Sequence, residues 1–365
     1  MIVRNEAPVI ERCLASVKPW VDHWVIVDTG STDGTQALVR RAMAGVAGEL
    51  HERPWRNFAH NRNEALQLAR ARADHLLFID ADEQLAVPAG FSWPALTADG
   101  YFLTCRMAGT EYQRNALVAT RRDWRWVGVL HEYLSADGAQ PWQQLPGPVI
   151  EVSHDGARAR DPGTYLKDIA VLEQALRDEP DNTRYVYYLA QSYRDAGQHA
   201  ASLAQYQRRA ALGGWEEERW FAQFQAAALL ERTGAAPEAV RAAYLAAYAA
   251  RPQRAEPLCA LARQCRERKD FALGALFALQ ASRIPMPTDI LFVDAEVYRW
   301  RALDELAVNA YYTPHQAQGR EALDASGVLL PRRIRASGSR RRMPGISSLL
   351  GLNLACLLRC MLSLR

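Results

Sequence analysis

The residues best suited to chemistry stand in one short acidic cluster. Residues 76–79 are four apolar side chains, and they lead directly into Asp80, Asp82 and Glu83. An apolar run without alternation is typical of a strand that is buried on both faces. Carboxylates packed this closely repel one another unless a cation lies among them, which indicates a divalent metal site. The alternative is an acidic turn whose aspartates cap a helix, and these eight residues alone do not separate the two interpretations.

Three further polar positions are expected at the same edge of the sheet. Asp28 ends a second apolar run, and the loop after it contains Gly30, which lets the backbone approach a ligand closely. Arg62 lies in the first turn of a helix predicted over residues 59–71. A nucleotide would fit the set, with a carboxylate for its base or ribose, an arginine for its diphosphate and paired aspartates for a bridging metal. Taken singly, Asp28 is more simply a turn cap and Arg62 a solvated helix residue.

The elements that must position these side chains alternate between strand and helix. Strands are predicted over residues 1–3, 24–28 and 76–79, and one helix begins near Pro8. The order β-α-β-α-β-α-β predicts a parallel sheet with right-handed connections and helices on both faces. In such sheets, ligands bind outside the carboxyl ends of the strands, where the acidic cluster would lie.

Composition and charge narrow the class of protein. The 365 residues allow two or three domains, and the net charge is +3. Eight arginines stand after residue 331 and no acidic residue follows Asp324, so residues 1–331 carry a net charge of −5. This argues against a nucleic-acid-binding surface over most of the chain. The six cysteines form no CxxC pair, and the charged start shows no signal peptide, so a reduced, cytoplasmic protein is expected.

Several stretches in combination resemble the family 2 glycosyltransferases of the GT-A fold. The resemblance covers roughly residues 1–155 and is carried by Met1-Ile2-Val3-Arg4-Asn5-Glu6, by Val27-Asp28-Thr29-Gly30-Ser31-Thr32-Asp33-Gly34-Thr35 and by Phe78-Ile79-Asp80-Ala81-Asp82-Glu83. It implies a Rossmann-like α/β domain with a mostly parallel sheet. It also implies sugar transfer with inversion from a nucleotide-sugar donor, with a UDP-sugar expected. Family members usually carry residues ahead of the first of these stretches, so we expect either a late start or a shortened central strand.

The resemblance also implies roles for individual residues. Asp80 and Asp82 would be the DxD motif that holds Mg²⁺ or Mn²⁺, and His154, at the end of a strand predicted from residue 149, would complete the metal shell. His154 has the equally simple interpretation of a satisfied turn residue. The donor would be bound by six residues of the matching stretches and the following helix, namely Asn5, Glu6, Asp28, Gly30, Arg62 and Asp80.

A candidate base follows two strands predicted for the acceptor half, over residues 101–106 and 116–120. Inversion in a single displacement needs a carboxylate that takes the acceptor proton. Glu132 is our candidate for this general base, with His131 beside it as a positioning group or hydrogen-bond donor. Trp124 and Trp126, just upstream, could form an acceptor platform. The alternative is that both tryptophans pack a core and that Glu132 is an ordinary surface residue.

From residue 165 the pattern becomes helical and repetitive. Ala190, Ala227 and Ala262 stand at matching positions 37 and 35 residues apart, close to the tetratricopeptide (TPR) period of about 34. A fourth, looser unit is expected over residues 300–326. Such helix pairs stack into a solenoid that binds peptides or its own neighbours. Certain bacterial family 2 enzymes, which act on lipopolysaccharide core or on peptides, are similar in carrying such an extension.

The sequence therefore predicts a GT-A α/β domain over residues 1–160, an all-α TPR solenoid over 161–330 and a basic, apolar tail over 331–365. The tail suits contact with an anionic membrane, at its inner face, and equally suits an abnormal reading frame. The predicted function is transfer of a sugar to a cell-envelope glycan or a peptide, with protein partners or self-association through the repeats. The rival hypothesis is a non-catalytic TPR adaptor whose nucleotide-binding domain is degenerate. An intact acidic cluster favours the enzyme.

Overall fold

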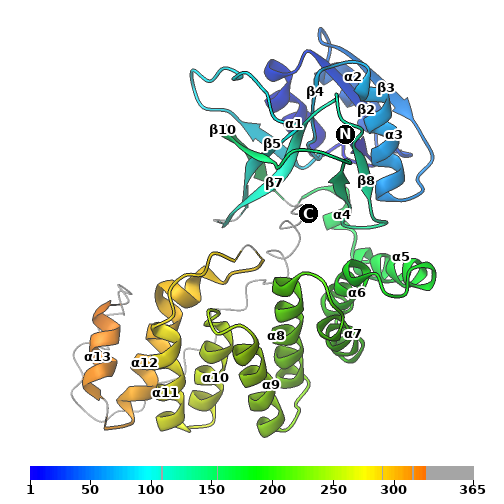
Figure 1. Cartoon of the computed structure of the whole chain (residues 1–365). Coiled ribbons are helices and arrows are strands. Elements are labelled where there is room, and N and C mark those ends of the chain that lie inside the picture. The colour runs from blue at the N-terminus through cyan, green and yellow to red at the C-terminus, as the bar shows by residue number, and fades with distance from the viewer. Residues whose placement is uncertain (108–109, 154, 290, 315, 326–365) are drawn as a thin grey trace. The chain divides into compact units, whose positions relative to one another are not determined.

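Figure 1 shows the computed structural model of the chain, which describes residues 1–107, 110–153, 155–289, 291–314 and 316–325. The chain folds into two compact units. The first unit comprises Met1–Asp178, and the second unit comprises the described residues from Glu179 onward. The tail predicted over residues 331–365 lies outside the described residues, so its membrane contact stays a prediction. Within the described part of the chain, no helix is long and apolar enough to cross a membrane.

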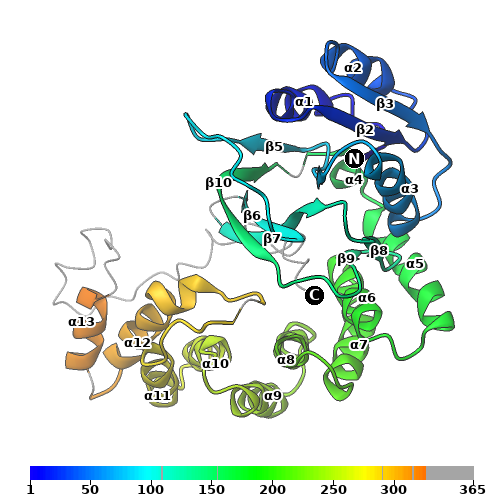
Figure 2. The ribbon, with the colours of Figure 1, turned by 45° about the horizontal axis from the view of Figure 1, so that its top comes forward.

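The first unit begins with three parallel strands, in the strand order β1-β2-β3. Residues 25–27 of β2 are β-branched and buried, which suits a strand covered on both faces. Figure 2 shows α1 and α2 on one side of β2 and α3 on the other. The elements are β1 (Ile2–Val3), α1 (Ile10–Val17), the 3₁₀-helix η1 (Lys18–Trp20), β2 (His23–Asp28), α2 (Thr35–Ala42), β3 (Ala47–Glu52) and α3 (Phe58–Arg70).

A mixed sheet of five strands completes the first unit, in the order β4-β7-β6-β10-β5. The predicted α/β class is confirmed, but the expectation that residues 76–79 continue the parallel ladder is wrong, because β4 pairs antiparallel with β7. β1 has only two residues and does not reach β4 as a ladder partner among the described strands. The strands are β4 (His75–Leu77), β5 (Glu83–Ala86), β6 (Gly100–Met107), β7 (Thr110–Ala119) and β10 (Gln143–Val152), and a separate hairpin comprises β8 (Arg125–Val127) and β9 (Tyr133–Ser135).

Two helices after the sheet still belong to the first unit. They are α4 (Ala157–Arg160) and α5 (Thr164–Asp178). The hydroxyl of Thr164 donates to the carbonyl of Arg158 at 2.6 Å, and Arg158 donates to the carboxylate of Asp168 at 2.5 Å. These bonds tie α5 to α4. The first unit therefore extends to Asp178, whereas the sequence prediction placed the boundary at residue 160.

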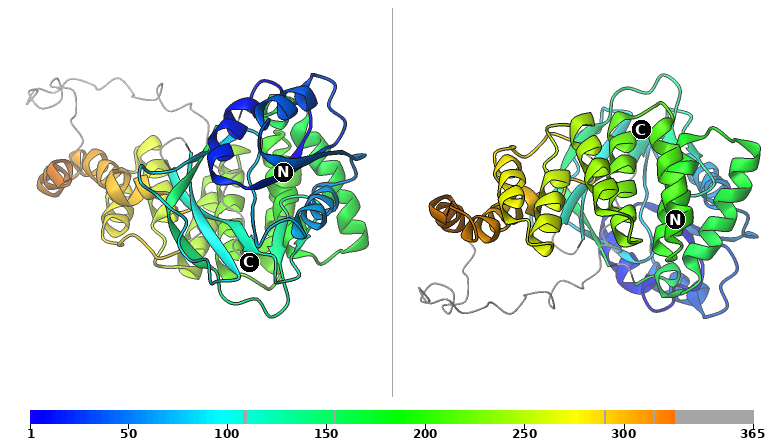
Figure 3. Two further views of the ribbon diagram at one scale, coloured as in Figure 1. Left: turned by 90° about the horizontal axis from the view of Figure 1, so that it is seen from above. Right: turned by 90° about the horizontal axis from the view of Figure 1, so that it is seen from below.

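The second unit consists of helices that follow one another as antiparallel pairs, as both views of Figure 3 show. Ala190, Ala227 and Ala262, the three positions used to predict the repeat, are each fully buried. Small side chains there let neighbouring helices pack closely. The helices are α6 (Thr183–Asp195), α7 (His199–Ala211), α8 (Glu216–Arg232), α9 (Pro237–Ala250), α10 (Glu256–Glu267), α11 (Phe271–Ser282), the π-helix η2 (Val297–Arg301), α12 (Ala302–Tyr311) and α13 (Gln316–Ala325).

A buried arginine joins distant parts of the second unit. Arg254, with no exposed surface, lies over the ring of Trp220 at 4.0 Å. It donates to Glu256 at 2.7 Å and to Asp289 at 3.2 Å. The side chains of both acidic partners are buried as well, so the positive charge of Arg254 is neutralised inside the unit. Its guanidinium can therefore stack on the ring of Trp220 in the core.

The amine of Met1 lies inside the first unit, where it donates to the carbonyl of Val25 at 3.1 Å. Burial lowers the pKa of this amine from 8.0 to about 6; Arg62 lowers it further, and Asp80 and Cys13 oppose the shift. Because the unfolded chain binds the proton more tightly, the free energy of unfolding should be highest above pH 8 and should fall by roughly 2 kcal/mol as the pH drops to 6.

This pH dependence can be isolated with a chemical control. The 365-residue chain and the same chain acetylated at Met1 would be unfolded by urea at pH 6, 7 and 8. The acetylated protein should lack this part of the slope, whereas histidines contribute equally to both proteins. Identical slopes for the two proteins would contradict the prediction.

Candidate active site

The side chain of Asp28, at the end of β2, is fully buried, and only one of its two carboxylate oxygens has hydrogen-bond partners among the described residues. Its Oδ1 accepts hydrogen bonds from the backbone N–H of Gly30 and Ser31 at 2.9 and 2.8 Å and from the amide of Gln36 at 3.2 Å. Its Oδ2 has no hydrogen-bond partner among the described residues. Burial by itself raises the pKa of Asp28, but these hydrogen bonds hold the pKa below its usual value. A buried, ionised oxygen without a donor is suited to accept one from a ligand.

Asn5 and Gly30 shape the loop that follows Asp28. The backbone N–H of Asn5 donates to the hydroxyl of Ser31 at 2.8 Å, and the Asn5 side-chain oxygen accepts from the N–H of Thr32 at 2.9 Å. Gly30 has φ +105°, which favours glycine over other residues. The structure thus uses the polar groups of Asn5 to hold this loop beside Asp28.

Arg62 in α3 joins two of the predicted functional carboxylates. Its Nη2 donates to Asp80 at 3.0 Å and its Nε donates to Glu132. The guanidinium also lies over the ring of Trp126, 5.1 Å from the ring centre. Burial raises the pKa of Asp80, but the positive charge of Arg62 outweighs it and the pKa is lowered. The arginine, the aspartate and the candidate base therefore form one ion-paired network.

Asp82 and Glu6 form a second acidic pair, and neither is paired with a cation among the described residues. Asp82 accepts from the N–H of Gly156 at 3.3 Å, and Glu6 accepts from the N–H of Ala157 at 2.9 Å. Burial, and then the charge of Asp80, raises the pKa of Asp82. Burial also raises the pKa of Glu6, to about 7. The hydrogen bond from Ala157 reduces this shift, and the negative charge of Asp82 increases it.

The loop after β10 closes on this acidic pair. A Cβ atom at Gly156 would lie 2.9 Å from the carboxylate of Asp82, so a larger residue there would displace this side chain. Arg12 of α1 fixes the loop through its ion pair with Asp155. His154, which the sequence suggested as a metal ligand, lies outside the described residues, so its role stays a prediction.

The charges of the site fit a divalent cation that shares its ligands with a substrate. Among the described residues, no three His, Cys, Asp or Glu side chains are grouped closely enough to hold a metal by themselves. Mg²⁺ is commonly held by one or two carboxylates together with substrate phosphates and water. Asp82, whose pKa is raised, and the partly engaged Asp80 could supply such a pair.

Glu83 has a different role from the other two carboxylates of the cluster. Its side chain is 3% exposed and accepts two hydrogen bonds from Arg114, at 2.5 and 2.6 Å. The backbone N–H of Asp80 donates to Glu83 at 2.9 Å. Glu83 therefore lies beside Asp80, but Arg114 neutralises its charge, and it holds the turn that carries Asp80.

The segment that carries His131 and Glu132 makes a tight turn. His131 has φ +53°, an uncommon value for a residue with a side chain, and Gly128 has φ +108°. The Glu132 side chain is 8% exposed, so it is not an ordinary surface residue. Trp124 is buried and donates from its ring N–H to the carbonyl of Ala119 at 2.9 Å. Trp124 is therefore a core residue, and the suggestion that it forms part of an acceptor platform is wrong.

Asn63, which was not among the predicted site residues, positions this network. The side-chain amide of Asn63 donates to the carbonyl of Trp126 at 2.9 Å, and the Asn63 oxygen accepts from the N–H of Trp126 at 2.8 Å. This two-way clasp joins α3 to β8, directly beside Arg62. The signal available in the sequence was an amide next to an arginine in the first turn of a helix, and its partner is 63 residues away.

Comparison with known proteins relates the first part of this site to a family. Residues 1–88 match the model of Glycosyl transferase family 2. The first unit carries a family 2 glycosyltransferase domain. The stretches quoted for the resemblance, including those with Asp28, Asp80 and Asp82, lie inside the matched range.

Three relatives extend the comparison. A TPR repeat-containing protein of Synechococcus elongatus is 33% identical and covers 50% of this chain and 48% of its own length. The glycosyltransferase SunS of Bacillus subtilis is 25% identical, with 52% and 47% covered. The lipopolysaccharide core biosynthesis glycosyltransferase LpsC of Rhizobium meliloti is 37% identical over 23% of this chain and 31% of its own. This chain thus spans about half the length of the first two relatives.

A search of solved structures matches MamA, at 13% identity and a TM-score of 0.36, over 45% of this chain and 87% of MamA. The family 2 domain in the first unit and the repeated helix pairs in the second agree with the predicted combination of glycosyltransferase and TPR regions.

Proposed function

We propose that this protein is an inverting glycosyltransferase that uses a nucleotide-sugar donor and a divalent cation. A UDP-sugar is the expected donor, and the acceptor is a hydroxyl or thiol of a cell-envelope glycan or a peptide. The matched family domain supports glycosyl transfer, and the names of SunS and LpsC support the same reaction class. The name of LpsC supports an envelope glycan as the acceptor.

The observation that carries the proposal is the free oxygen of Asp28. Its carboxylate is fully buried, its Oδ1 is held by three donors, and its Oδ2 has no partner among the described residues. A base N–H or a ribose hydroxyl would supply the missing donor. An unsatisfied buried acceptor is costly, so a loop built to keep one supports a binding role.

The diphosphate of the donor is expected beside the carboxylates that follow β4. Asp82 and Asp80 would hold the cation, with Glu6 adding negative charge nearby. When bound, the cation would neutralise negative charge on the departing nucleotide. Asp80 is also held by Arg62, so the arginine positions one metal ligand and adds positive charge at the same place.

Glu132 is proposed as the general base. It would take the proton from the acceptor oxygen or sulfur while that atom bonds to the anomeric carbon and the nucleoside diphosphate leaves with the electrons of the broken bond. The ion pair with Arg62 supports this role by fixing the position of the carboxylate. Arg62 is fixed in turn by Trp126 and Asp80.

The second unit is proposed to bind a protein partner, a peptide acceptor or a second copy of the chain. The support is its row of helix pairs, because such rows expose an extended surface for binding.

Titration calorimetry with UDP tests the proposed donor site. UDP should bind in the presence of Mg²⁺ or Mn²⁺, and Asp28→Asn should weaken binding by about tenfold or more, because one hydrogen bond to a charged group is worth about 1.5–3 kcal/mol. Asp137→Asn, which alters a carboxylate that is 89% exposed, is the matched control and should bind UDP normally. A folded wild type that bound neither UDP nor other nucleoside diphosphates would favour the adaptor hypothesis.

Asn63→Asp should lower turnover by about 10–100-fold with a smaller change in UDP affinity. The carboxylate keeps the acceptor of the clasp but loses the donor to the carbonyl of Trp126, and small displacements near reacting groups have effects of this size. The measurement is kcat and KM for donor hydrolysis beside UDP titration. Gln67→Ala, an exposed change one turn along α3, is the control. Equal losses in turnover and thermal stability for Asn63→Asp and Asn63→Ala, with UDP binding lost as well, would mean that Asn63 only stabilises the fold.

A further inference from the structure

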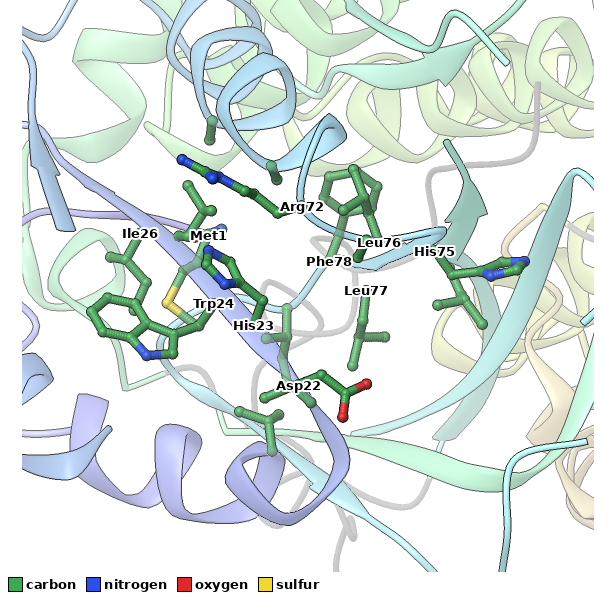
Figure 4. Close-up of a pocket in the computed structure, with 18 of the residues that line it drawn as sticks. Met1, Asp22, His23, Trp24, Ile26, Arg72, His75, Leu76, Leu77 and Phe78 are labelled. Carbon is green, nitrogen blue, oxygen red and sulfur yellow. Dashed lines mark hydrogen bonds between the residues drawn. The ribbon is translucent and has the colours of Figure 1, made fainter. Parts of the chain in front are cut away.

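Two features of the structure are not used by the proposed sugar transfer. One is a cavity of about 530 Å³ in the first unit, between β2 and β4, where Figure 4 shows Trp24 and Ile26 on one side and Leu76 and Leu77 on the other. Its walls are mainly apolar, so it concerns the packing of the sheet. The other is the connection that follows α11 in the second unit, and its contacts are suited to the recognition of a peptide.

The connection after α11 is longer than its counterparts. Four residues join α7 to α8 and five join α9 to α10, whereas residues 283–294, twelve in all, precede the next helical residue after α11. Helices in bundles are usually joined by about 2–8 residues, and longer connections are often functional. Pro285 and Pro287 favour an extended chain. Figure 2 shows the connection extending toward α8 before the chain returns to α12. We call residues 286–289 and 291–294 the strap.

A carboxylate of the strap is held by two arginines. Asp289, whose side chain is 5% exposed, accepts hydrogen bonds from Arg251 at 2.6 Å through each of its two oxygens and from Arg254 at 3.2 Å. Burial by itself raises the pKa of Asp289, but these bonds hold the pKa below its usual value. Two parallel bonds from one guanidinium match the geometry of a carboxylate. This part of the surface therefore selects an ionised acidic side chain.

The main chain of the strap is bound by side chains at the start of α8 and α10. The N–H of Leu291 donates to Glu217 at 2.8 Å, and the N–H of Asp294 donates to Glu256 at 3.2 Å. Arg254 donates to the carbonyl of Leu291 at 3.1 Å. These three contacts use main-chain atoms, so they would hold any extended segment that followed the same path.

An aromatic side chain completes the contacts of the strap. The rings of Phe292 and Phe221 of α8 lie 4.7 Å apart between their centres. Phe292 has φ +44°, an uncommon and costly value for a residue with a side chain. A partner that presented its ring from a relaxed backbone would avoid this cost. The surface thus accepts a carboxylate and, three residues later, an aromatic ring.

We propose that the N-terminal parts of α8 and α10, with Arg251 and Arg254, form a binding site for an extended segment of a partner protein. That segment would carry a carboxylate three residues before an aromatic side chain. The strap occupies the site in this structure and is a competitor of the partner. A partner must displace the strap, so its apparent affinity is reduced by the fraction of molecules in which the site is open. This inference rests on the binding role proposed for the second unit and does not depend on sugar transfer.

Binding of the strap sequence as a separate peptide tests the proposal. The probe is a fluorescein-labelled peptide of residues 286–294, and the measurement is fluorescence anisotropy with the full chain. Asp289→Ala/Phe292→Ala releases the resident strap and should bind the peptide about tenfold more tightly than wild type, or better. Met286→Ala is the matched control, because this strap side chain is 45% exposed, and should behave as wild type. Adding Arg251→Gln to the double variant should weaken peptide binding by about tenfold or more, since the carboxylate loses its paired bonds.

Hydrogen exchange of the wild-type chain gives a second measurement that needs no variant to fold. Amides of the strap should exchange faster than those within α8 and α10, because the strap opens without unfolding the helices. An excess of the unlabelled peptide should accelerate exchange in the strap further, since the peptide takes its place.

Three results would overturn the proposal. One is equal peptide binding by wild type and by a folded double variant, including no binding by either. Another is tight binding that survives Arg251→Gln. The third is a strap that exchanges only together with α8 and α10, with or without peptide, because it would then be an integral part of the helical core. UDP titration of the same proteins separates this test from the proposed donor site, since loss of UDP binding would leave the peptide result unchanged.

Discussion

Asp82→Asn should abolish divalent-dependent UDP binding while leaving the fold intact. The substitution removes one negative charge from the expected cation site with almost no change in volume. The carbonyl of the new amide can still accept from Gly156, so the loop after β10 keeps its anchor. Loss of a metal that contributes several kcal/mol to the transition state should lower turnover by about 10²–10³-fold or more.

The measurement for Asp82→Asn is calorimetry with UDP, with and without Mn²⁺, beside donor turnover. The thermal midpoint should stay the same or rise, because burial and the charge of Asp80 disfavour the native carboxylate. Asp123→Asn is a suitable control, since the Asp123 side chain is 82% exposed. Metal-dependent UDP binding at wild-type strength in Asp82→Asn would refute the assigned metal site, because the carboxylate proposed to hold the cation would then be dispensable.

Glu132→Gln should lower turnover by about 10²–10⁴-fold with donor affinity nearly unchanged. Glutamine keeps the shape and can still accept a hydrogen bond from Arg62, but it cannot take the acceptor proton. His131→Ala should have a smaller effect if His131 only orients its neighbour. The measurement is transfer to a working acceptor, with UDP titration of the same variant.

Because Glu132 is paired with Arg62, the same variant also tests whether Glu132 only positions this arginine. If Glu132 served only to hold Arg62, Glu132→Gln would weaken UDP binding, because a neutral amide holds the arginine next to Asp80 less strongly than a carboxylate does. Wild-type transfer by Glu132→Gln would exclude Glu132 as the base. Asp123, the next carboxylate to try as the base, is a weak substitute because it is exposed and paired with Arg70.

Local sequence patterns were sufficient to predict several helices and strands of the first unit. Residues 24–28 were predicted as a strand and β2 comprises His23–Asp28; residues 59–71 were predicted as a helix and α3 comprises Phe58–Arg70. Both depend on short-range features: β-branched apolar residues in one case, and in the other a first turn in which Asn57 accepts from the N–H of His60 at 2.8 Å. Strand partners could not be predicted in the same way, because β4 takes β7 as its neighbour through contacts more than 40 residues apart.

In the second unit, too, the repeat was predictable from local sequence patterns and the long-range contacts were not. The buried alanines of the repeat were identified from spacing alone, since every helix pair needs a small residue at its closest approach. The contacts of Arg254 with Trp220 and Asp289 follow no local pattern. The end of the first unit at Asp178 was likewise missed, because the bonds that attach α5 are made by side chains of ordinary polar residues.

The sequence by itself determined the α/β class, the helical repeats and the acidic and glycine-rich stretches that mark a family 2 glycosyltransferase domain. Only the tertiary structure showed that Arg62 joins Asp80 to Glu132, that Glu83 belongs to Arg114 and that Asn63 holds Trp126. The reason is physical. Residue types and short-range periodicity specify which groups a segment contributes, whereas the charge that each carboxylate meets is set by side chains from distant strands and helices, which come together only when the sheet edges and the α3–β8 contact form.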